Sequence, residues 1–128
     1  MNYIGKIDTQ TYSCIAPSLV TDDVIITDER IGHIQSRHPG HFELIFPYFQ
    51  EALQHPDYIL EDSGKSGSCL ILKWIRDKDI RFQMVLRVLA SNDNPIFKNS
   101  IISAWRISES RWNNYLRSRK VLYKHSDV

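Results

Sequence analysis

Apolar and polar residues are spaced differently in the two halves of the chain. Apolar side chains recur at helical spacing over residues 28–38 and over residues 42–54. From residue 57 onward the pattern changes to short apolar runs and alternation, which indicate strands. The clearest alternation covers residues 80–89 and predicts a strand with one buried face and one available face.

Local signals set the ends of the two predicted helices. Thr27 or Asp28 is suited to cap the first helix, and Pro39 forces the residue before it out of the helical region. Pro47 lies inside the second helical stretch, where it either kinks the helix or begins its main part. Pro56 ends that stretch, so we expect two helices before the sheet.

Four strands are expected after these helices, at 57–61, 69–75, 80–89 and 100–105. The glycine- and serine-rich segment 63–68 and the segment 91–95 are predicted loops, and neither carries a phosphate-loop pattern. Ser108 is suited to cap a helix that runs to about Ser118, and residues 121–123 are a further candidate strand. We therefore predict an α+β fold in which N-terminal helices precede a four-stranded antiparallel sheet and a C-terminal helix. The helices should pack on one face of the sheet, and the other face should form the floor of a cleft.

Length and composition indicate one globular domain. Residues 1–26 hold short β-leaning pieces broken by turn formers and Pro17, and we interpret them as an N-terminal arm. Residues 27–128 then form a single domain of ordinary size, and an apolar content of 42% excludes wholesale disorder. No apolar stretch approaches the roughly 20 residues of a membrane helix, and the N-terminus lacks the plan of a signal peptide. A cytoplasmic protein is expected, with Cys14 and Cys69 as small core residues.

Charge is segregated along the chain although the net charge is only +1. Five acidic residues and no Lys or Arg lie between positions 41 and 62, whereas six basic residues and one acidic residue lie between positions 106 and 124. Such a distribution permits one basic face on a nearly neutral protein. The basic segment is either a solvated helix face or a phosphate-binding face.

A cluster of basic and titratable side chains marks the end of the first predicted helix. His33 and Arg37 are four positions apart and share a helix face, and His38 is released from the helix by Pro39. Imidazole exchanges protons near neutral pH, and guanidinium binds phosphate oxygens. A single helical His is more often a packing or capping residue, but the group of three favours a functional role.

Two other kinds of chemistry fit less well. His33, His38 and His41 offer three metal ligands, but their spacing is not that of a zinc-binding helix and no Cys or carboxylate accompanies them. We therefore predict no metal site and no cofactor. Neither a nucleophile elbow nor a recognisable Cys-His pattern is present.

The alternating strand carries further cations. Arg81, Gln83 and Arg87 should point from the same face, with the Lys73 ammonium nearby if it shares that face. Polar residues at alternate positions are often only solvated. Arg87 lies between apolar neighbours in an expected central strand, where a half-buried Arg needs an anionic partner.

The order of several motifs resembles the phage- and mobile-element-encoded branch of the barnase/EndoU/colicin/RelE-like nucleases. The motifs lie at 5–8, 26–39, 56–59 and 99–105, and the resemblance extends from Ile4 to Tyr123. It implies N-terminal helices followed by a four-stranded antiparallel sheet, and metal-independent cleavage of RNA. It also implies a helical His at His33 or His38, a basic strand residue at Lys73 or Arg87, and a late hydroxyl at Ser103, with Ser100 as the alternative.

These observations predict an endoribonuclease that acts as an effector or toxin of a phage or mobile element. One imidazole, His33 or His38, would activate the ribose 2′-hydroxyl and the other would protonate the leaving oxygen, giving a 2′,3′-cyclic phosphate. The expected site residues are His33, Arg37, His38, Lys73, Arg87 and Ser103 for catalysis, and Arg81, Trp105, Arg106 and Tyr115 for RNA binding. The expected partners are single-stranded RNA or tRNA and a neutralising protein. The alternative is a non-catalytic module that binds nucleic acid or protein with the same basic face.

Overall fold

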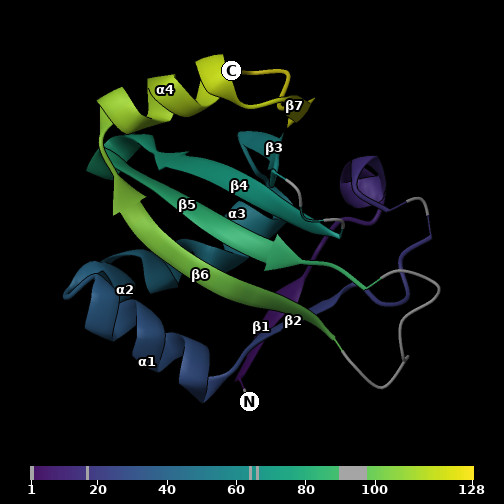
Figure 1. The fold of residues 1–128 in the computed structure, drawn as a ribbon, viewed down its shortest axis with the longest axis horizontal. Helices are drawn as coiled ribbons and strands as arrows, with labels where there is room; N and C mark the ends of the chain where they lie inside the picture. Colours follow the sequence, from purple (N-terminus) through teal and green to yellow (C-terminus); the bar gives the residue numbers. More distant parts are fainter. Residues whose placement is uncertain (1, 17, 64, 66, 90–97) are drawn as a thin grey trace.

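Seven strands form one mixed sheet in the order β1-β2-β6-β5-β4-β3-β7 (Figure 1). The computed structural model describes residues 2–16, 18–63, 65, 67–89 and 98–128. Its strands are β1 (Asn2–Lys6), β2 (Asp23–Ile26), β3 (Tyr58–Glu61), β4 (Ser68–Ile75), β5 (Ile80–Arg87), β6 (Asn99–Ile107) and β7 (Val121–Lys124). Strands β2 and β6 are parallel, and the other neighbouring strands are antiparallel.

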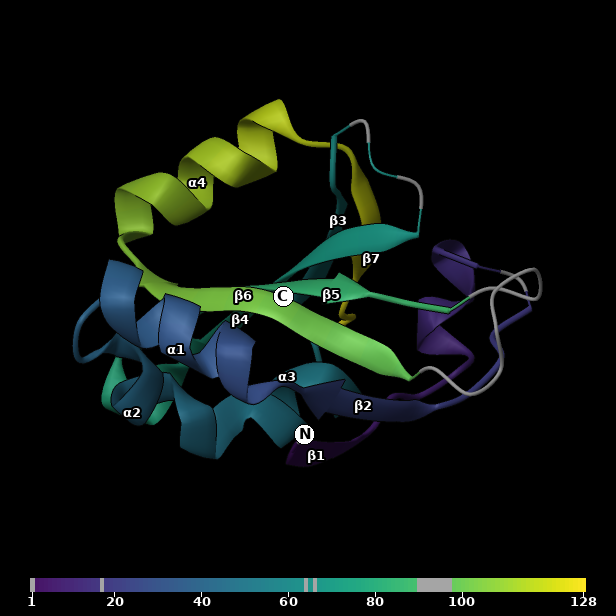
Figure 2. The ribbon, with the colours of Figure 1, turned by 60° about the horizontal axis from the view of Figure 1, so that its bottom comes forward.

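Helices cover both faces of this sheet. The helices are α1 (Asp28–Arg37), α2 (His41–Ile45), α3 (Phe49–Gln54) and α4 (Glu109–Ser118), and three short 3-10 turns are η1 (Thr11–Cys14), η2 (Phe46–Tyr48) and η3 (Arg76–Lys78). Figure 2 shows α1, α2 and α3 on one side of the sheet and α4 on the other.

Each layer of helices has its own apolar core. On the first face, Ile34, Ile45 and Phe49 from the helices pack with Phe82 and Met84 from β5. On the second face, Trp112 and Tyr115 from α4 pack with Leu60, Leu72 and Ile107 from the sheet. The sheet is thus the middle layer of three.

The predicted ends of the first and the last helix are confirmed, whereas the stretch expected as a second helix is divided into α2 and α3 by η2. The Thr27 hydroxyl accepts a hydrogen bond from the Arg30 backbone N–H, and the Ser108 hydroxyl accepts one from Arg111, so each caps its helix. α1 ends at Arg37, with His38 outside the helical region as expected before a proline. Pro47 lies in the 3-10 turn that precedes α3.

The predicted four-stranded antiparallel sheet is wrong. The segment interpreted as an arm supplies β1 and β2, and the C-terminus supplies β7, so the sheet has seven strands and one parallel pair. Strands β2 and β7 have four residues each, too few for a long alternating pattern. Buried Val24 and Ile26 place β2 in the same core as Ile34.

The expected placement of all helices on one face is also wrong. α4 packs on the face that should have been open, because Trp112 and Tyr115 give it an apolar stripe that must be buried. The strand expected at 80–89 ends at Arg87. Residues 64 and 66 of the predicted 63–68 loop, the whole 91–95 loop and Pro17 lie outside the described residues.

Both cysteines are free thiols, but only one is a core residue. Cys69 is buried, as expected, whereas Cys14 is exposed on η1, so that part of the prediction is wrong. Within the described ranges, no helix is long and apolar enough to span a bilayer.

Candidate active site

The end of α1 and the strand β6 meet through two aromatic rings. The His38 imidazole stacks on the Trp105 indole, with ring centroids 4.7 Å apart and planes inclined by 12°. His38 follows α1 directly, and α1 packs along β6. Stacking fixes the plane of the imidazole.

A tight turn places a second imidazole beside the first. The His41 backbone N–H donates to the His38 carbonyl over 3.0 Å, with Pro39 and Gly40 at the two central positions. Gly40 has φ +83° and ψ −15°, which is the third residue of a type II turn. The His38 and His41 ring centroids are therefore only 5.5 Å apart. The sequence offered His41 only as a metal ligand, and the Pro39-Gly40 pair is the signal that predicts this turn.

The tautomer of His41 follows from its hydrogen bond. Its Nδ1 accepts the Arg106 backbone N–H over 3.0 Å. A neutral imidazole that accepts at Nδ1 carries its proton on Nε2. His41 therefore presents an N–H donor on its outer edge.

Two arginines border an open pocket next to His41. The pocket has a volume of about 460 Å³ and is lined by His41, Asp79, Arg81, Arg106, Ile107, Ser108 and Glu109. The Arg81 guanidinium contacts the Asp79 carboxylate at 3.2 Å and lies 4.1 Å above the Trp74 ring. Arg106 donates to the Asp79 carbonyl over 3.5 Å. Two of the residues predicted to bind RNA thus lie in one pocket.

The environment of His38 lowers its pKa below the ordinary value of 6.5. Burial is the main cause, and repulsion from His41 in its protonated form and from Arg37 acts in the same direction. The imidazole is consequently neutral at neutral pH and able to accept a proton. This is the state that a general base requires.

Ser103 and Arg87 lie along the same sheet face as Trp105. Ser103 is two positions before Trp105 on β6 and opposite Val85 on β5, and Arg87 is opposite Ser100. Side chains at alternate positions of a strand, and of directly paired residues, share a face. Arg87 is exposed, so the expectation that it is half-buried is wrong, although β5 is a central strand as expected.

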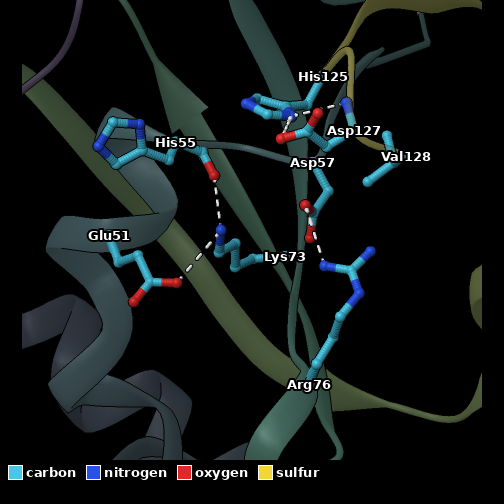
Figure 3. A pocket seen from close by; sticks show the side chains of 8 residues that line it. All are labelled: Glu51, His55, Asp57, Lys73, Arg76, His125, Asp127 and Val128. Atoms are coloured by element: carbon cyan, nitrogen blue, oxygen red, sulfur yellow. Dashed lines mark hydrogen bonds and ion pairs between the residues drawn. The ribbon is translucent and has the colours of Figure 1, made fainter.

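Lys73 lies on the opposite face of the sheet. It pairs in register with Phe82, whose ring is in the first core, whereas Arg81 and Gln83 pair with residues of the second face. Figure 3 shows its ammonium beside α3, where it donates to the His55 carbonyl over 2.8 Å and contacts the Glu51 carboxylate at 3.3 Å. The Lys73 side chain is thereby separated by the sheet from Arg81.

The remaining predicted residues differ in their relation to the two imidazoles. His33 is exposed on α1, next to Ile34, which is the buried residue of that helix. Arg37 is exposed in the last turn of α1, and its charge acts on His38. Tyr115 is 8% exposed and donates from its hydroxyl to the Gln83 side chain over 2.6 Å, so its ring is part of the second core.

Carboxylates and thiols do not assemble into a metal site in the described part of the chain. No group of three His, Cys, Asp or Glu side chains there is close enough to hold an ion. His38, His41, Trp105, Arg81 and Arg106 form the candidate site, and the chemistry of these side chains is that of proton transfer and anion binding.

Comparisons with known proteins place the chain in a family. Searches of curated proteins and of solved structures gave no match. A family model described as phage-Barnase-EndoU-ColicinE5/D-RelE like nuclease matches residues 2–124, which is nearly the whole chain. Because that match includes every strand and helix described above, the chain belongs to this phage-associated nuclease family.

Proposed function

We propose that this nuclease cleaves RNA without a metal ion and that the reacting phosphate lies beside His38 and His41. The proposal rests on one observation: a neutral imidazole stacked on Trp105 lies 5.5 Å from a second imidazole, next to a pocket lined by two arginines. Paired imidazoles with adjacent guanidiniums supply the proton transfer and the charge stabilisation that phosphodiester transesterification requires.

Each group has a role in the proposed reaction. His38 removes the proton of the ribose 2′-hydroxyl, whose oxygen attacks the adjacent phosphorus. Arg81 and Arg106 hold the non-bridging phosphate oxygens. The His41 Nε2–H donates a hydrogen bond to the departing 5′-oxygen, which takes a proton from water. The hydroxide formed in this way takes the proton held on His38, so that both imidazoles return to their starting state. The products are a 2′,3′-cyclic phosphate and a 5′-hydroxyl.

Ser103 and Arg87 extend the site along the sheet in this proposal. The Ser103 hydroxyl shares a face with Trp105 and is placed to orient the phosphate, and Arg87 contacts the backbone further along the strand. His33, Lys73 and Tyr115 have no role in the chemistry, because they lie on other surfaces or inside the core.

The test is an assay for 2′,3′-cyclic phosphate ends on a mixture of tRNA and mRNA in excess EDTA. The wild type and the His33→Ala variant should produce such ends, and the His38→Ala and His41→Ala variants should lose roughly 10²–10⁴-fold in rate. His33→Ala is the matched control, since it removes an exposed imidazole from the same helix. DNA, which lacks the 2′-hydroxyl, should remain intact.

Intact RNA at high enzyme concentration would contradict the proposal. Binding of RNA without cleavage would then favour the non-catalytic nucleic-acid-binding module, and binding of neither RNA nor DNA would favour a protein-binding one.

We further propose that the protein acts in the cytoplasm as a toxic effector of a mobile element and is neutralised there by a protein partner. A metal-independent ribonuclease needs no activating cofactor, so a host must restrain it by another route. Expression of the wild type should arrest growth, whereas expression of His38→Ala should not. Equal growth with both proteins would overturn the toxin role.

A further inference from the structure

One face of α4 carries two arginines that the proposed chemistry does not use. Arg111 and Tyr115 are four positions apart on α4, and Arg119 is the extended residue that directly follows the helix; these three residues are called the row below. The Arg111 guanidinium lies 5.9 Å from the centroid of the Tyr115 ring, and that of Arg119 lies 5.4 Å from it. Both cations therefore converge on the same aromatic ring.

A continuous series of contacts connects this row to the two imidazoles. The Tyr115 hydroxyl donates to the Gln83 side chain over 2.6 Å, and Gln83 is the register partner of Trp105. Trp105 in turn stacks on His38. These contacts run from α4 across β5 to β6, on the face of the sheet that α4 covers. Figure 2 shows α4 on that face.

No carboxylate of a described residue neutralises the charge of the row. Among the described residues, neither the Arg111 nor the Arg119 side chain forms an ion pair with a carboxylate. Contact with the Tyr115 ring restricts the two guanidiniums but leaves their outer edges able to donate. An arginine pre-organised in this way is suited to bind a phosphate.

We propose that Arg111 and Arg119 bind a phosphodiester group next to the one that is cleaved. The substrate would then be an extended RNA strand that passes from the turn between α1 and α2, over Trp105, to α4. This inference rests on the proposed function, and it adds a second point of attachment that a dinucleotide cannot reach.

The matched control lies on the same helix. Arg117 is two positions from Tyr115, which is about 200° around a helix of 3.6 residues per turn. It is exposed and borders a separate shallow depression with Glu109, Ser110 and Asn113. Replacing Arg117 changes the net charge as much as replacing Arg111 but leaves the row intact.

Binding decides this inference independently of cleavage. The probe is a single-stranded oligonucleotide that carries 2′-O-methyl groups and cannot be cleaved by 2′-hydroxyl attack. The double variant Arg111→Ala/Arg119→Ala should bind it roughly 10–100-fold more weakly. The slope of log Kd against log salt concentration should decrease by about 1–2. The Arg117→Ala variant should bind like the wild type. Equal weakening by Arg117→Ala, or no weakening in the double variant, would overturn the inference.

Cleavage separates the two proposals. If both hold, the double variant loses kcat/KM on a long oligoribonucleotide by the same factor and retains the wild-type kcat/KM on a dinucleotide. If the wild type binds the methylated probe through Arg111 and Arg119 but cleaves no RNA, only the proposed ribonuclease activity fails. Circular dichroism of each variant confirms that the helix is retained.

Discussion

The His38 imidazole lies flat against the Trp105 indole, with 12° between the two planes. Trp105 is held in β6 opposite Gln83, so its orientation is determined by the sheet rather than by the end of a helix. This stacking determines the direction in which the edge of the imidazole points. It also removes water from one side of the ring, which is part of the burial that lowers the His38 pKa.

Trp105 should therefore act as a positioning residue for His38. Trp105→Ala should lower kcat roughly 10–100-fold, because a base that is misplaced by a fraction of an ångström transfers protons slowly. Trp105→Phe retains a ring for stacking and should recover most of the rate. The readout that separates positioning from a general structural defect is the His38 pKa measured by NMR, which should rise toward 6.5 in Trp105→Ala. An unchanged His38 pKa in Trp105→Ala would show that the indole does not shield this imidazole.

The pH dependence of the reaction should report His38. A base must be unprotonated, and the His38 pKa lies below 6.5, so the acidic limb of kcat/KM should fall below pH 6.5. Arg37→Gln removes one of the smaller causes of the lowered pKa and should shift this limb slightly upward. If kcat/KM of the wild type already falls at a pH above 7, a different group acts as the base.

The lowered His38 pKa also makes the free energy of unfolding depend on pH. The folded protein favours the neutral form of the His38 imidazole. The stability that His38 contributes is therefore present above pH 6.5 and decreases as the pH falls through the lowered pKa. Between these two values the unfolded chain binds more protons than the folded chain. The free energy of unfolding should therefore increase with pH across this interval, and His38→Gln should weaken that dependence.

Much of the local structure could be predicted because the signals act over a few residues. Thr27 and Ser108 cap helices through their own hydroxyls, and Pro39 and Pro47 restrict their own backbone. The alternation over β5 is long enough to identify its two faces. These features depend on neighbouring residues alone.

The arrangement of the sheet depends on contacts that short segments do not reveal. β2 pairs with β6, about 75 residues later in the chain, and nothing within the four residues of β2 specifies that partner. The face occupied by Lys73 follows from its register with Phe82, which only the pairing of β4 and β5 determines. The resemblance offered Lys73 or Arg87 as a basic strand residue without deciding between their faces.

Lys73 should be dispensable for the chemistry. Its ammonium is 2.8 Å from the His55 carbonyl and lies across the sheet from Arg81. Lys73→Met should change kcat of the folded enzyme by less than about tenfold, or about 1.4 kcal/mol in the activation barrier. The measurement is a single-turnover rate at saturating enzyme, with His38→Ala as the inactive reference. A loss as large as that of His38→Ala would move the active site to the face of the sheet that carries Lys73.

The two late serines should differ in their effect on the reaction. Ser103 shares the face of Trp105, two positions away, whereas Ser100 lies further along β6 opposite Arg87. Ser103→Ala should lower kcat roughly tenfold through loss of one hydrogen bond to the phosphate, and Ser100→Ala should have a smaller effect. Single-turnover rates of the two variants, measured side by side, decide between them. A larger loss in Ser100→Ala would assign the hydroxyl to the other serine.

Asn99, the first residue of the motif that contains both serines, should be required for stability rather than for chemistry. Its side chain is 0% exposed and makes three hydrogen bonds: Oδ1 accepts the Leu89 N–H over 2.8 Å, and Nδ2 donates to the carbonyls of Thr21 and Asp23 over 2.8 and 3.0 Å. It thereby joins the segment before β2, the residues after β5 and the start of β6. Asn99→Ala would leave these backbone groups without a partner and should lower the free energy of unfolding by at least about 3 kcal/mol.

The matched control for this prediction is Asn113→Ala, which removes an exposed amide from α4 and should change the free energy of unfolding by less than about 0.5 kcal/mol. Urea unfolding of both variants gives the comparison. Asn99→Asp keeps the acceptor for Leu89 but directs a carboxylate oxygen at two carbonyls, so it should be unstable at neutral pH and partly recover when the carboxyl group is protonated. If Asn99→Ala unfolds at the same urea concentration as the wild type, the three hydrogen bonds do not contribute to stability. The presence of Asn99 in the motif would then have to be explained by a role in the reaction.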